Sequence, residues 1–176
     1  IEEDINTRKG VERIIRAAFT YAREQGRRRV TLADKANAMP HAGGLYRRVF
    51  AEVGAEFEDV VRNAMYADAL ALDLVLHPAR YDVIVAANLF GDILSDLAAA
   101  LVGGLGLAPS ASLLPGRVGL FEPVHGSAPD LVGTERANPL AAIMTVALML
   151  RQLGHPAIAD VIEAAVQGAV RGGHTT

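Results

Sequence analysis

Two aspartates four residues apart are the strongest indication of chemistry in this sequence. Asp92 and Asp96 fall on one predicted helix, so their carboxylates share a face. Two carboxylates at this spacing repel each other, and apolar neighbours on the helix make the charged forms more unfavourable by removing water. A bound divalent cation would offset both the repulsion and the loss of hydration. Carboxylate oxygens favour Mg²⁺ or Mn²⁺. The alternative is a solvated acidic edge on which Asp92 only complements the N-terminal helix dipole.

Lys35 and Asp68 are two further candidates for chemistry. Lys35 follows, after Asp34, a strand predicted over Val30–Ala33, where a rigid backbone places a lysine well for work as a base. The alternative is an ordinary solvated lysine at a strand end. Asp68 lies on a predicted helix, Met65–Leu76, and joins the acidic pair only if the fold brings it to the same place.

A loop from Phe121 to Asp130 combines backbone N–H donors, small side chains and a carboxylate. This combination suits a ribose with its adjoining phosphates, because an acidic residue holds a ribose diol and repels a 2′-phosphate. His125 beside Ser127 does not predict nucleophilic catalysis, since nothing places Ser127 on a strand–helix elbow. The stretch Gly104–Gly106 is not a Rossmann fingerprint, because Pro109 stands where its third glycine should be.

The elements that must position these residues alternate between helices and strands, which predicts an α/β fold. The Met65–Leu76 helix is apolar nearly all round, so we expect it to be buried on most sides. Tyr81–Ala87 is rich in Val and Ile, which predicts a fully buried strand of a largely parallel sheet. The other predicted strands are Val30–Ala33, Val60–Arg62 and Val118–Phe121, and the other predicted helices run from Asn6 or Thr7 to Gly26, over Leu45–Phe57 after a breaker stretch at Pro40–Gly44, over Asp92–Leu101, from Pro139 to Leu153 with Asn138 as its cap, and over Ala157–Val170.

Composition narrows the classes of protein that fit. The 176 residues are 51% hydrophobic and 21% charged, so a sizeable core forms, and the low aromatic content of 5% suits packed α/β layers. A net charge of −3 argues against nucleic acid as a partner. No apolar run reaches the roughly 18 residues that span a bilayer, so we expect no membrane association. The absence of cysteine excludes disulfides and thiolate metal sites and fits a reducing cytoplasm.

Four blocks of sequence, taken together, resemble one family. They are Asp34–Asn37, Tyr66–Ala69, Asn88–Leu97 and Phe121–Asp130. Their order and spacing resemble the isocitrate/isopropylmalate dehydrogenase family of β-decarboxylating dehydrogenases, over about Thr7 to Gly173. The resemblance implies an isopropylmalate-dehydrogenase-like α/β/α sandwich with a mixed sheet, distinct from a Rossmann fold, in which helices of the second domain form the dimer interface.

The resemblance also implies a domain division. Residues 1–80 would be mostly the second domain, which carries the dimer interface and the active site. Residues 81–176 would be the remainder of that domain and part of the cofactor-binding first domain. The N-terminal part of the first domain would be missing, and the beginning at Ile1 and the end within Gly172–Thr176 fit this expectation of a longer protein.

Each candidate residue takes a role from the resemblance. Asp92 and Asp96 match metal carboxylates of one subunit, and Asp68 matches the carboxylate that the partner subunit contributes. Lys35 matches a lysine, also supplied across the interface, that helps to deprotonate the substrate hydroxyl, so Lys35 and Asp68 are the predicted catalytic residues. Asn37 matches a residue near the substrate and the nicotinamide. The predicted NAD-binding residues are Glu122, His125, Gly126, Ser127, Ala128, Pro129, Asp130 (which favours NAD over NADP) and Asn138 (at the adenine).

The implied activity is NAD- and Mg²⁺- or Mn²⁺-dependent oxidative decarboxylation of a 3-substituted malate by a cytoplasmic homodimer or larger assembly with a shared active site. The segment Ser110–Leu113 is closer to isopropylmalate enzymes, and 3-isopropylmalate is slightly favoured. The segment Gly103–Ser110 is closer to isocitrate and homoisocitrate enzymes, and tartrate or malate stays open as well. The substrate is in each case a hydroxy di- or tricarboxylic acid.

Two departures from the family pattern leave another class of function open. The family's substrate-binding arginines and its proton-donating tyrosine belong to the N-terminal portion, which this sequence lacks. Asp73 stands where the family more often has a neutral polar residue or a histidine, and this carboxylate is expected to perturb the site. A non-catalytic truncated or regulatory subunit is therefore the alternative to an enzyme.

Overall fold

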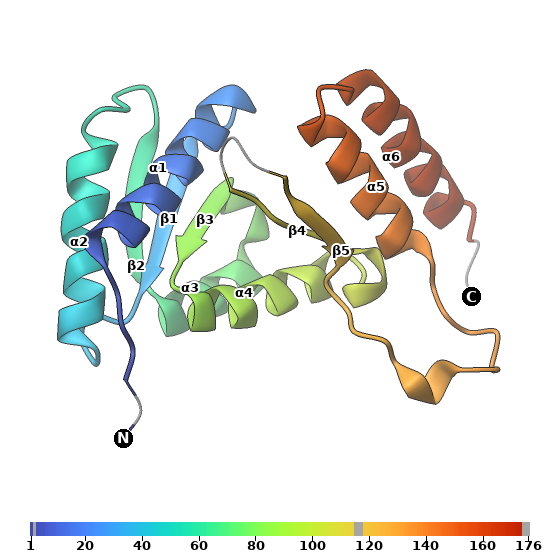
Figure 1. The fold of residues 1–176 in the computed structure, drawn as a ribbon, viewed down its shortest axis with the longest axis horizontal. Coiled ribbons are helices and arrows are strands. Elements are labelled where there is room, and N and C mark those ends of the chain that lie inside the picture. The colour runs from blue at the N-terminus through green and yellow to red at the C-terminus, as the bar shows by residue number, and fades with distance from the viewer. Residues whose placement is uncertain (2, 115–117, 174–176) are drawn as a thin grey trace. The chain divides into compact units, whose positions relative to one another are not determined.

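A parallel sheet organises the first of the two units, Ile1–Ala98 and Ala99–Thr176, into which the chain divides (Figure 1). The computed structural model describes residues 1, 3–114 and 118–173. Strands that alternate with helices confirm the predicted α/β class. The end of the segment Gly172–Thr176 discussed above, from His174 onward, lies outside the described residues.

β1 (Arg29–Asp34) lies between β2 (Val61–Tyr66) and β3 (Val83–Ala86) and runs parallel to both. β1 is buried from its second residue onward, as expected for the central strand. The prediction of full burial for the third strand is wrong, because β3 is a short edge strand in which only Val85 is fully buried. The last residues of β1 and β2, Asp34 and Tyr66, are paired in register, so both strands end at one edge of the sheet.

α1 (Arg8–Glu24) and α2 (Pro40–Gly54) pack against one face of this sheet. The Thr7 hydroxyl accepts a hydrogen bond from the Gly10 amide at 3.2 Å, which confirms the predicted cap. α2 begins at Pro40, earlier than predicted, because proline suits the first turn of a helix and the supposed breaker stretch forms that turn. Ile15 and Phe19 of α1 are fully buried in the core on this face.

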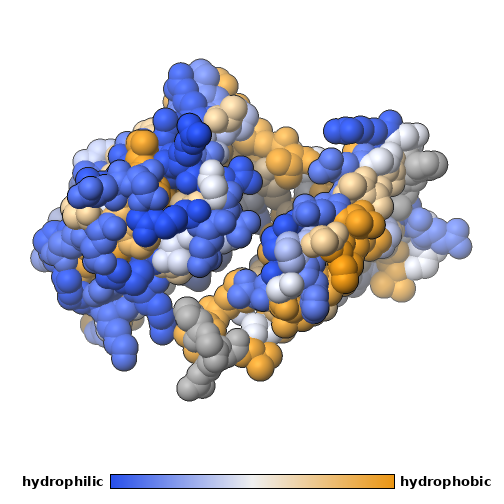
Figure 2. Space-filling model, turned by 90° about the horizontal axis from the view of Figure 1, so that it is seen from above, coloured by the Kyte–Doolittle hydropathy of each residue, from blue (hydrophilic) through white to orange (hydrophobic). Residues whose placement is uncertain are grey.

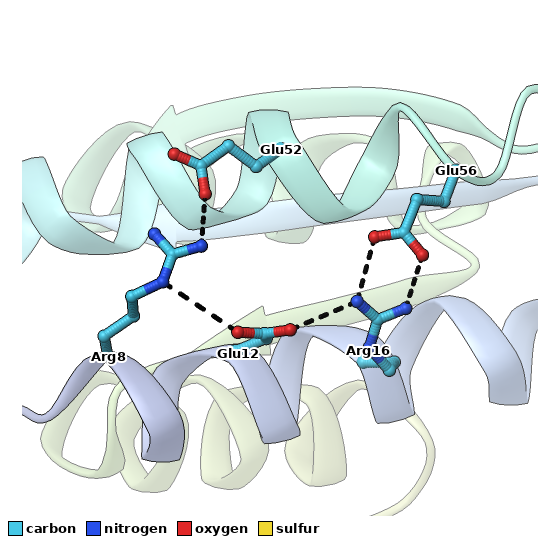
Figure 3. Close-up of polar contacts among 5 residues, drawn as sticks. All are labelled: Arg8, Glu12, Arg16, Glu52 and Glu56. Atoms are coloured by element: carbon cyan, nitrogen blue, oxygen red, sulfur yellow. Dashed lines mark hydrogen bonds and ion pairs between the residues drawn. The ribbon is translucent and has the colours of Figure 1, made fainter.

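Ion pairs join the exposed sides of the two helices (Figure 3). Arg8 of α1 lies 2.6 Å from Glu52 of α2, and Arg16 lies 2.6 Å from Glu56, just beyond α2. Glu12 pairs with both arginines along α1. Because exposed pairs gain little net free energy in water, the buried apolar core provides most of the stability of this layer.

α3 (Ala67–Leu76) and α4 (Asn88–Leu101) pack on the other face, with Leu70, Leu74 and Leu94 buried there. The prediction that the α3 helix is buried on most sides is wrong, since Leu72 and Leu76 are 65% and 61% exposed. Only one side of the helix rests on the sheet, so its opposite side is left apolar and open. α4 starts four residues before the predicted Asp92, and the 3₁₀ turn Pro78–Arg80 precedes β3.

The second unit consists of an antiparallel pair, β4 (Pro109–Ser112) and β5 (Leu120–Pro123), and two helices, α5 (Leu140–Gln152) and α6 (Pro156–Arg171). α5 packs against α6 and both strands. β4 was not predicted, because a proline, two serines and an alanine carry no strand pattern. Among the described residues, parallel and antiparallel pairs occur in separate sheets, in place of the single mixed sheet that the resemblance implied.

Hydrophobic surface is visible among hydrophilic residues in Figure 2. In the second unit, Leu153, Ile158 and Val161 of the α5–α6 pair and its connection are largely exposed. Within the described ranges, every helix is too short or too polar to cross a bilayer.

Candidate active site

Lys35 and Asp68 meet where β1 and β2 end. Lys35 directly follows β1, and Asp68 lies in the first turn of α3, which follows β2. Because the two parallel strands end in register, both side chains leave the same edge, and Lys35 Nζ lies 2.6 Å from Asp68 Oδ1. The side chain of Lys35 is 24% exposed and that of Asp68 is 69% exposed, so the pair is open to solvent. The hydrogen bond from Lys35 holds the pKa of Asp68 below its usual value.

Three residues that the sequence analysis did not assign surround this pair. Asp34 is 3% exposed and accepts hydrogen bonds from the Ala36 amide at 2.7 Å and from Arg47 Nε at 2.8 Å. The Arg47 guanidinium lies 4.7 Å from the centroid of the Tyr66 ring, and Lys35 Nζ lies 5.8 Å from the same centroid. No spacing in the sequence links Arg47 to the strand ends, because tertiary packing of α2 makes these contacts.

Asn37 lies in the turn between β1 and α2. Its side chain is exposed, two residues beyond Lys35. Gly43 of α2 sits so close to this turn that a Cβ atom there would be 2.6 Å from the Ala36 Cα. The turn that carries Lys35 and Asn37 therefore packs directly against α2. The role of Asn37 in binding substrate stays a prediction.

Asp92 and Asp96 lie on one side of α4, as the spacing predicts, and both are exposed. The side-chain Nδ2 of Asn88 donates a hydrogen bond to Asp92 Oδ2 at 3.1 Å. The apolar neighbours expected from the sequence are present, but within one chain they do not make a dry site: Leu94 is buried against the sheet, whereas Leu89 and Ile93 are exposed beside the aspartates. Two exposed carboxylates one helical turn apart fit a hard divalent cation that takes its remaining ligands from elsewhere.

Asp68 does not join that pair within one chain. Among the described residues, no three His, Cys, Asp or Glu side chains lie close enough together to hold a metal ion. The metal set of Asp68, Asp92 and Asp96 therefore stays a prediction that requires Asp68 to come from a partner subunit.

The predicted cofactor residues all lie in the second unit. Glu122 is on β5, and residues 126–130 are exposed, with Asp130 in the 3₁₀ turn Pro129–Leu131. His125 Nδ1 lies 2.9 Å from the Gly126 carbonyl oxygen, and Ala128 has a left-handed φ of +42°. Exposed backbone and small side chains suit contact with a ribose and phosphates, and the assignment of these residues to NAD stays a prediction.

Asn138 makes a capping contact at the start of α5, one residue before the N-cap position that Pro139 occupies. Its Oδ1 accepts a hydrogen bond from the Leu140 amide at 2.9 Å, and its side chain lies against Gly106, where a Cβ atom would be 3.2 Å from Asn138 Nδ2. The capping hydrogen bond expected of Asn138 is thus present, although α5 begins at Leu140, one residue later than predicted, and contact with an adenine stays a prediction. A larger residue at position 106 would displace this side chain.

Asp73 is engaged with residues near the opposite ends of the strands. Its Oδ2 accepts a hydrogen bond from the Tyr81 hydroxyl at 2.7 Å, and its Oδ1 lies 2.8 Å from His77 Nδ1 and 3.0 Å from Arg80 Nη1. Asp73 also borders a cavity of about 280 Å³, with Arg29, Thr31, Asn63, Met65, Arg80 and Tyr81. These partners, of which Arg80 is a cation, occupy both oxygens of the carboxylate that was expected to perturb the active site.

The Asp73 contacts predict an unusual tyrosine titration. Burial and the hydrogen bond to Asp73 raise the pKa of Tyr81 from 10.0 to about 12. The neutral phenol therefore stabilises the folded state fully below pH 10.0, and this contribution is lost as the pH rises through about 12. In Asp73→Asn we expect the Tyr81 pKa to fall below that of the wild type but stay above 10.0, because burial persists.

Near-ultraviolet absorbance of the ionised phenols, followed against pH, checks this prediction. Asp82→Asn is the matched control, because that neighbouring carboxylate accepts a hydrogen bond from the Arg28 amide. A tyrosine titration that is identical in Asp73→Asn and the wild type would contradict the assignment.

Comparison with known proteins defines the class to which this site belongs. Residues 2–176 match the family model described as isocitrate/isopropylmalate dehydrogenase, and the chain belongs to this family of β-decarboxylating dehydrogenases, as its sequence blocks predicted. The 3-isopropylmalate dehydrogenase of Beutenbergia cavernae is 49% identical over 171 residues, which cover 96% of this chain and 49% of that protein. The 3-isopropylmalate dehydrogenase of Archaeoglobus fulgidus is 48% identical over 170 residues, 97% of this chain and 52% of that protein.

A solved structure has the same fold. The crystal structure of isocitrate dehydrogenase from Methylococcus capsulatus matches with a TM-score of 0.94 and 47% identity, covering 97% of this chain and 50% of that one. The chain spans about half the length of the curated relatives it matches.

Proposed function

We propose that this chain supplies part of the active site of an NAD- and Mg²⁺- or Mn²⁺-dependent enzyme that oxidatively decarboxylates a 3-substituted malate. The observation that carries the proposal is the Lys35–Asp68 pair, 2.6 Å apart at the ends of β1 and β2 in a member of this family. The matched curated relatives are 3-isopropylmalate dehydrogenases, which favours 3-isopropylmalate as the substrate. The isocitrate dehydrogenase structure keeps isocitrate, and with it homoisocitrate, as the second candidate.

The residues of this chain divide the chemistry among them. A bound divalent cation supplies Lewis-acid stabilisation of developing oxyanions, and NAD accepts the hydride. Lys35 Nζ, as the neutral amine, would take the proton from the substrate hydroxyl and become an ammonium, and Asp68 would orient that amine by accepting its hydrogen bond. Asp92 and Asp96 would hold the cation by their carboxylate oxygens, and Asn37 would contact the substrate near the nicotinamide. Asp130 would accept hydrogen bonds from the ribose diol, which would favour NAD over NADP.

Assembly as a homodimer would bring Asp68 of one subunit to Asp92 and Asp96 of the other. Asp68, Leu72 and Leu76 recur every fourth residue along α3 and so share a face, and both leucines are exposed. On α4, the exposed Leu89 and Ile93 alternate with Asp92 and Asp96 on adjacent positions of the helix surface. Apolar side chains beside the acidic residues on both helices are what a buried subunit interface around a shared metal site requires.

Charge placed on this face is expected to break the dimer. Leu76→Glu in the intact protein should weaken dimerisation by roughly 2 kcal/mol or more, because a carboxylate would be buried without a partner. Sedimentation velocity measures the shift from dimer to monomer. Ile14→Glu is the matched control, since Ile14 is an exposed isoleucine of α1 on the other side of the sheet. A Leu76→Glu protein that remains as dimeric as the control would exclude α3 from the interface.

A substrate panel tests the activity itself. The intact protein should reduce NAD in the presence of Mg²⁺ or Mn²⁺ with 3-isopropylmalate, and more slowly with isocitrate, homoisocitrate, malate and tartrate. A preference for isocitrate or homoisocitrate would reassign the substrate within the family. Equal rates with all the acids would defeat any single-substrate function. No reduction with any of them would favour a non-catalytic subunit.

A further inference from the structure

Two contacts from one face of α2 hold the backbone on either side of Lys35. Gly43 packs against Ala36, the residue after Lys35, at a distance that admits no side chain. Four residues later on the same helix, Arg47 Nε donates a hydrogen bond at 2.8 Å to Asp34, the residue before Lys35. The Asp34 carboxylate also stabilises the turn itself, because it accepts a hydrogen bond from the Ala36 amide at 2.7 Å. The lysine is therefore presented from a short backbone segment that α2 fixes at both ends.

Arg47 also touches the strand that leads to Asp68. Its guanidinium stacks over the Tyr66 ring at 4.7 Å, and Lys35 Nζ lies over the same ring at 5.8 Å. Both distances are within the range of about 6 Å for attraction between a cation and an aromatic ring. Tyr66 is the last residue of β2 and stands two residues before Asp68. The Arg47 side chain therefore contacts the end of β1 through Asp34 and the end of β2 through Tyr66, and these two strands lead to the ion pair.

We infer that Arg47 is a positioning residue for Lys35, which fixes the lysine relative to Asp68 through Asp34 and Tyr66. The inference rests on the proposed function, in which Lys35 accepts the substrate proton. Arginine suits this role because a planar guanidinium can donate hydrogen bonds at its edge while its face stacks on a ring. Without Arg47, the buried Asp34 carboxylate would lose its cation, and the turn at Lys35 would rearrange to hydrate it.

Kinetics of the intact protein test the inference. We expect Arg47→Met to lower kcat by about 10- to 100-fold with little change in the KM for the hydroxy acid, because a displacement of about 1 Å at a catalytic group costs on this order. Arg48→Met is the matched control, since Arg48 is the exposed next residue of α2. Arg47→Lys keeps the charge on Asp34 but not the planar stack, so it should fold normally and show an intermediate kcat.

A double-variant cycle separates positioning from a general structural role. If Arg47 acts through Lys35, Arg47→Met should add less than about 3-fold to the loss already caused by Lys35→Met. An equal loss from Arg47→Met in both backgrounds would overturn the inference. Wild-type kcat in both Arg47→Lys and Arg47→Met would overturn it as well.

A nuclear magnetic resonance signal provides a readout that does not depend on turnover. The Lys35 Hε signals are assigned in the intact protein by their loss in Lys35→Met. The ring current of Tyr66 should shift them, and Arg47→Met should move them toward the position of an exposed lysine. An unmoved Lys35 signal would overturn the positioning role. Full activity of Lys35→Met would instead defeat the proposed function, while the signal would still report whether Arg47 holds the lysine.

Discussion

Lys35→Met in the intact protein is expected to lower kcat by about 10²- to 10⁴-fold, the range that a general acid or base contributes. Methionine keeps much of the length of the side chain but removes the amine that would take the hydroxyl proton. Asp68 would also lose the hydrogen bond that lowers its pKa, because Lys35 Nζ lies 2.6 Å away. Initial rates of NAD reduction at saturating hydroxy acid and metal measure the effect.

The sequence contains its own control for this variant. Lys9 is the other lysine, and it lies in the first turn of α1, remote in the sequence from the residues of the site. Lys9→Met should retain wild-type kcat. A Lys35→Met enzyme within about 3-fold of the Lys9→Met rate would exclude Lys35 as the base, because even weak general-base catalysis exceeds that factor.

Asp96→Asn is expected to abolish metal-dependent turnover, with apparent affinity for Mg²⁺ or Mn²⁺ lowered by about 10²-fold or more. Loss of a residue that only supports a metal ligand already costs about 10- to 100-fold, and removal of a ligand carboxylate should cost at least as much. The amide keeps the shape of the side chain but not its charge. Metal titrations of activity, together with direct binding of Mn²⁺ to the intact protein, separate lost affinity from lost chemistry.

A neighbour on the same helix controls for damage to α4. Ser95 is exposed and its hydroxyl donates to the Asp92 carbonyl oxygen, so Ser95→Ala changes a polar side chain beside the aspartates without removing a carboxylate. It should bind metal as the wild type does. Activity and Mn²⁺ affinity in Asp96→Asn equal to those of Ser95→Ala would show that the acidic pair is only a solvated edge of the helix.

Local periodicity was sufficient for most of the helices and for the central strand. The Thr7 cap is a contact within three residues, and the helical and strand patterns of α1 and β1 repeat within a few residues, so the sequence displays them directly. The common face of Asp92 and Asp96 has the same origin, since helical geometry alone sets the relation between residues four apart. Family membership was evident from sequence blocks, because each block keeps its residue types in order.

The burial of α3 and the places of β3 and β4 depended on tertiary packing, that is, on which helices and strands contact each other. The Met65–Leu76 pattern is apolar on nearly all sides, and only the packing of α3 on the sheet distinguishes the buried Leu70 from the exposed Leu72. The sequence pattern likewise could not show that β3 lies at an edge of the sheet, because its composition resembles that of a central strand. β4 has no composition typical of a strand and exists through its pairing with β5.

The sequence by itself determined the class of fold, the family and the residue types available for chemistry. Only the tertiary structure decided that Lys35 meets Asp68 and that Arg47 reaches the strand ends. The physical reason is the range of the interactions involved. Capping and helical periodicity act between near neighbours in the chain, whereas strand register and the seating of α2 join segments that the sequence keeps far apart.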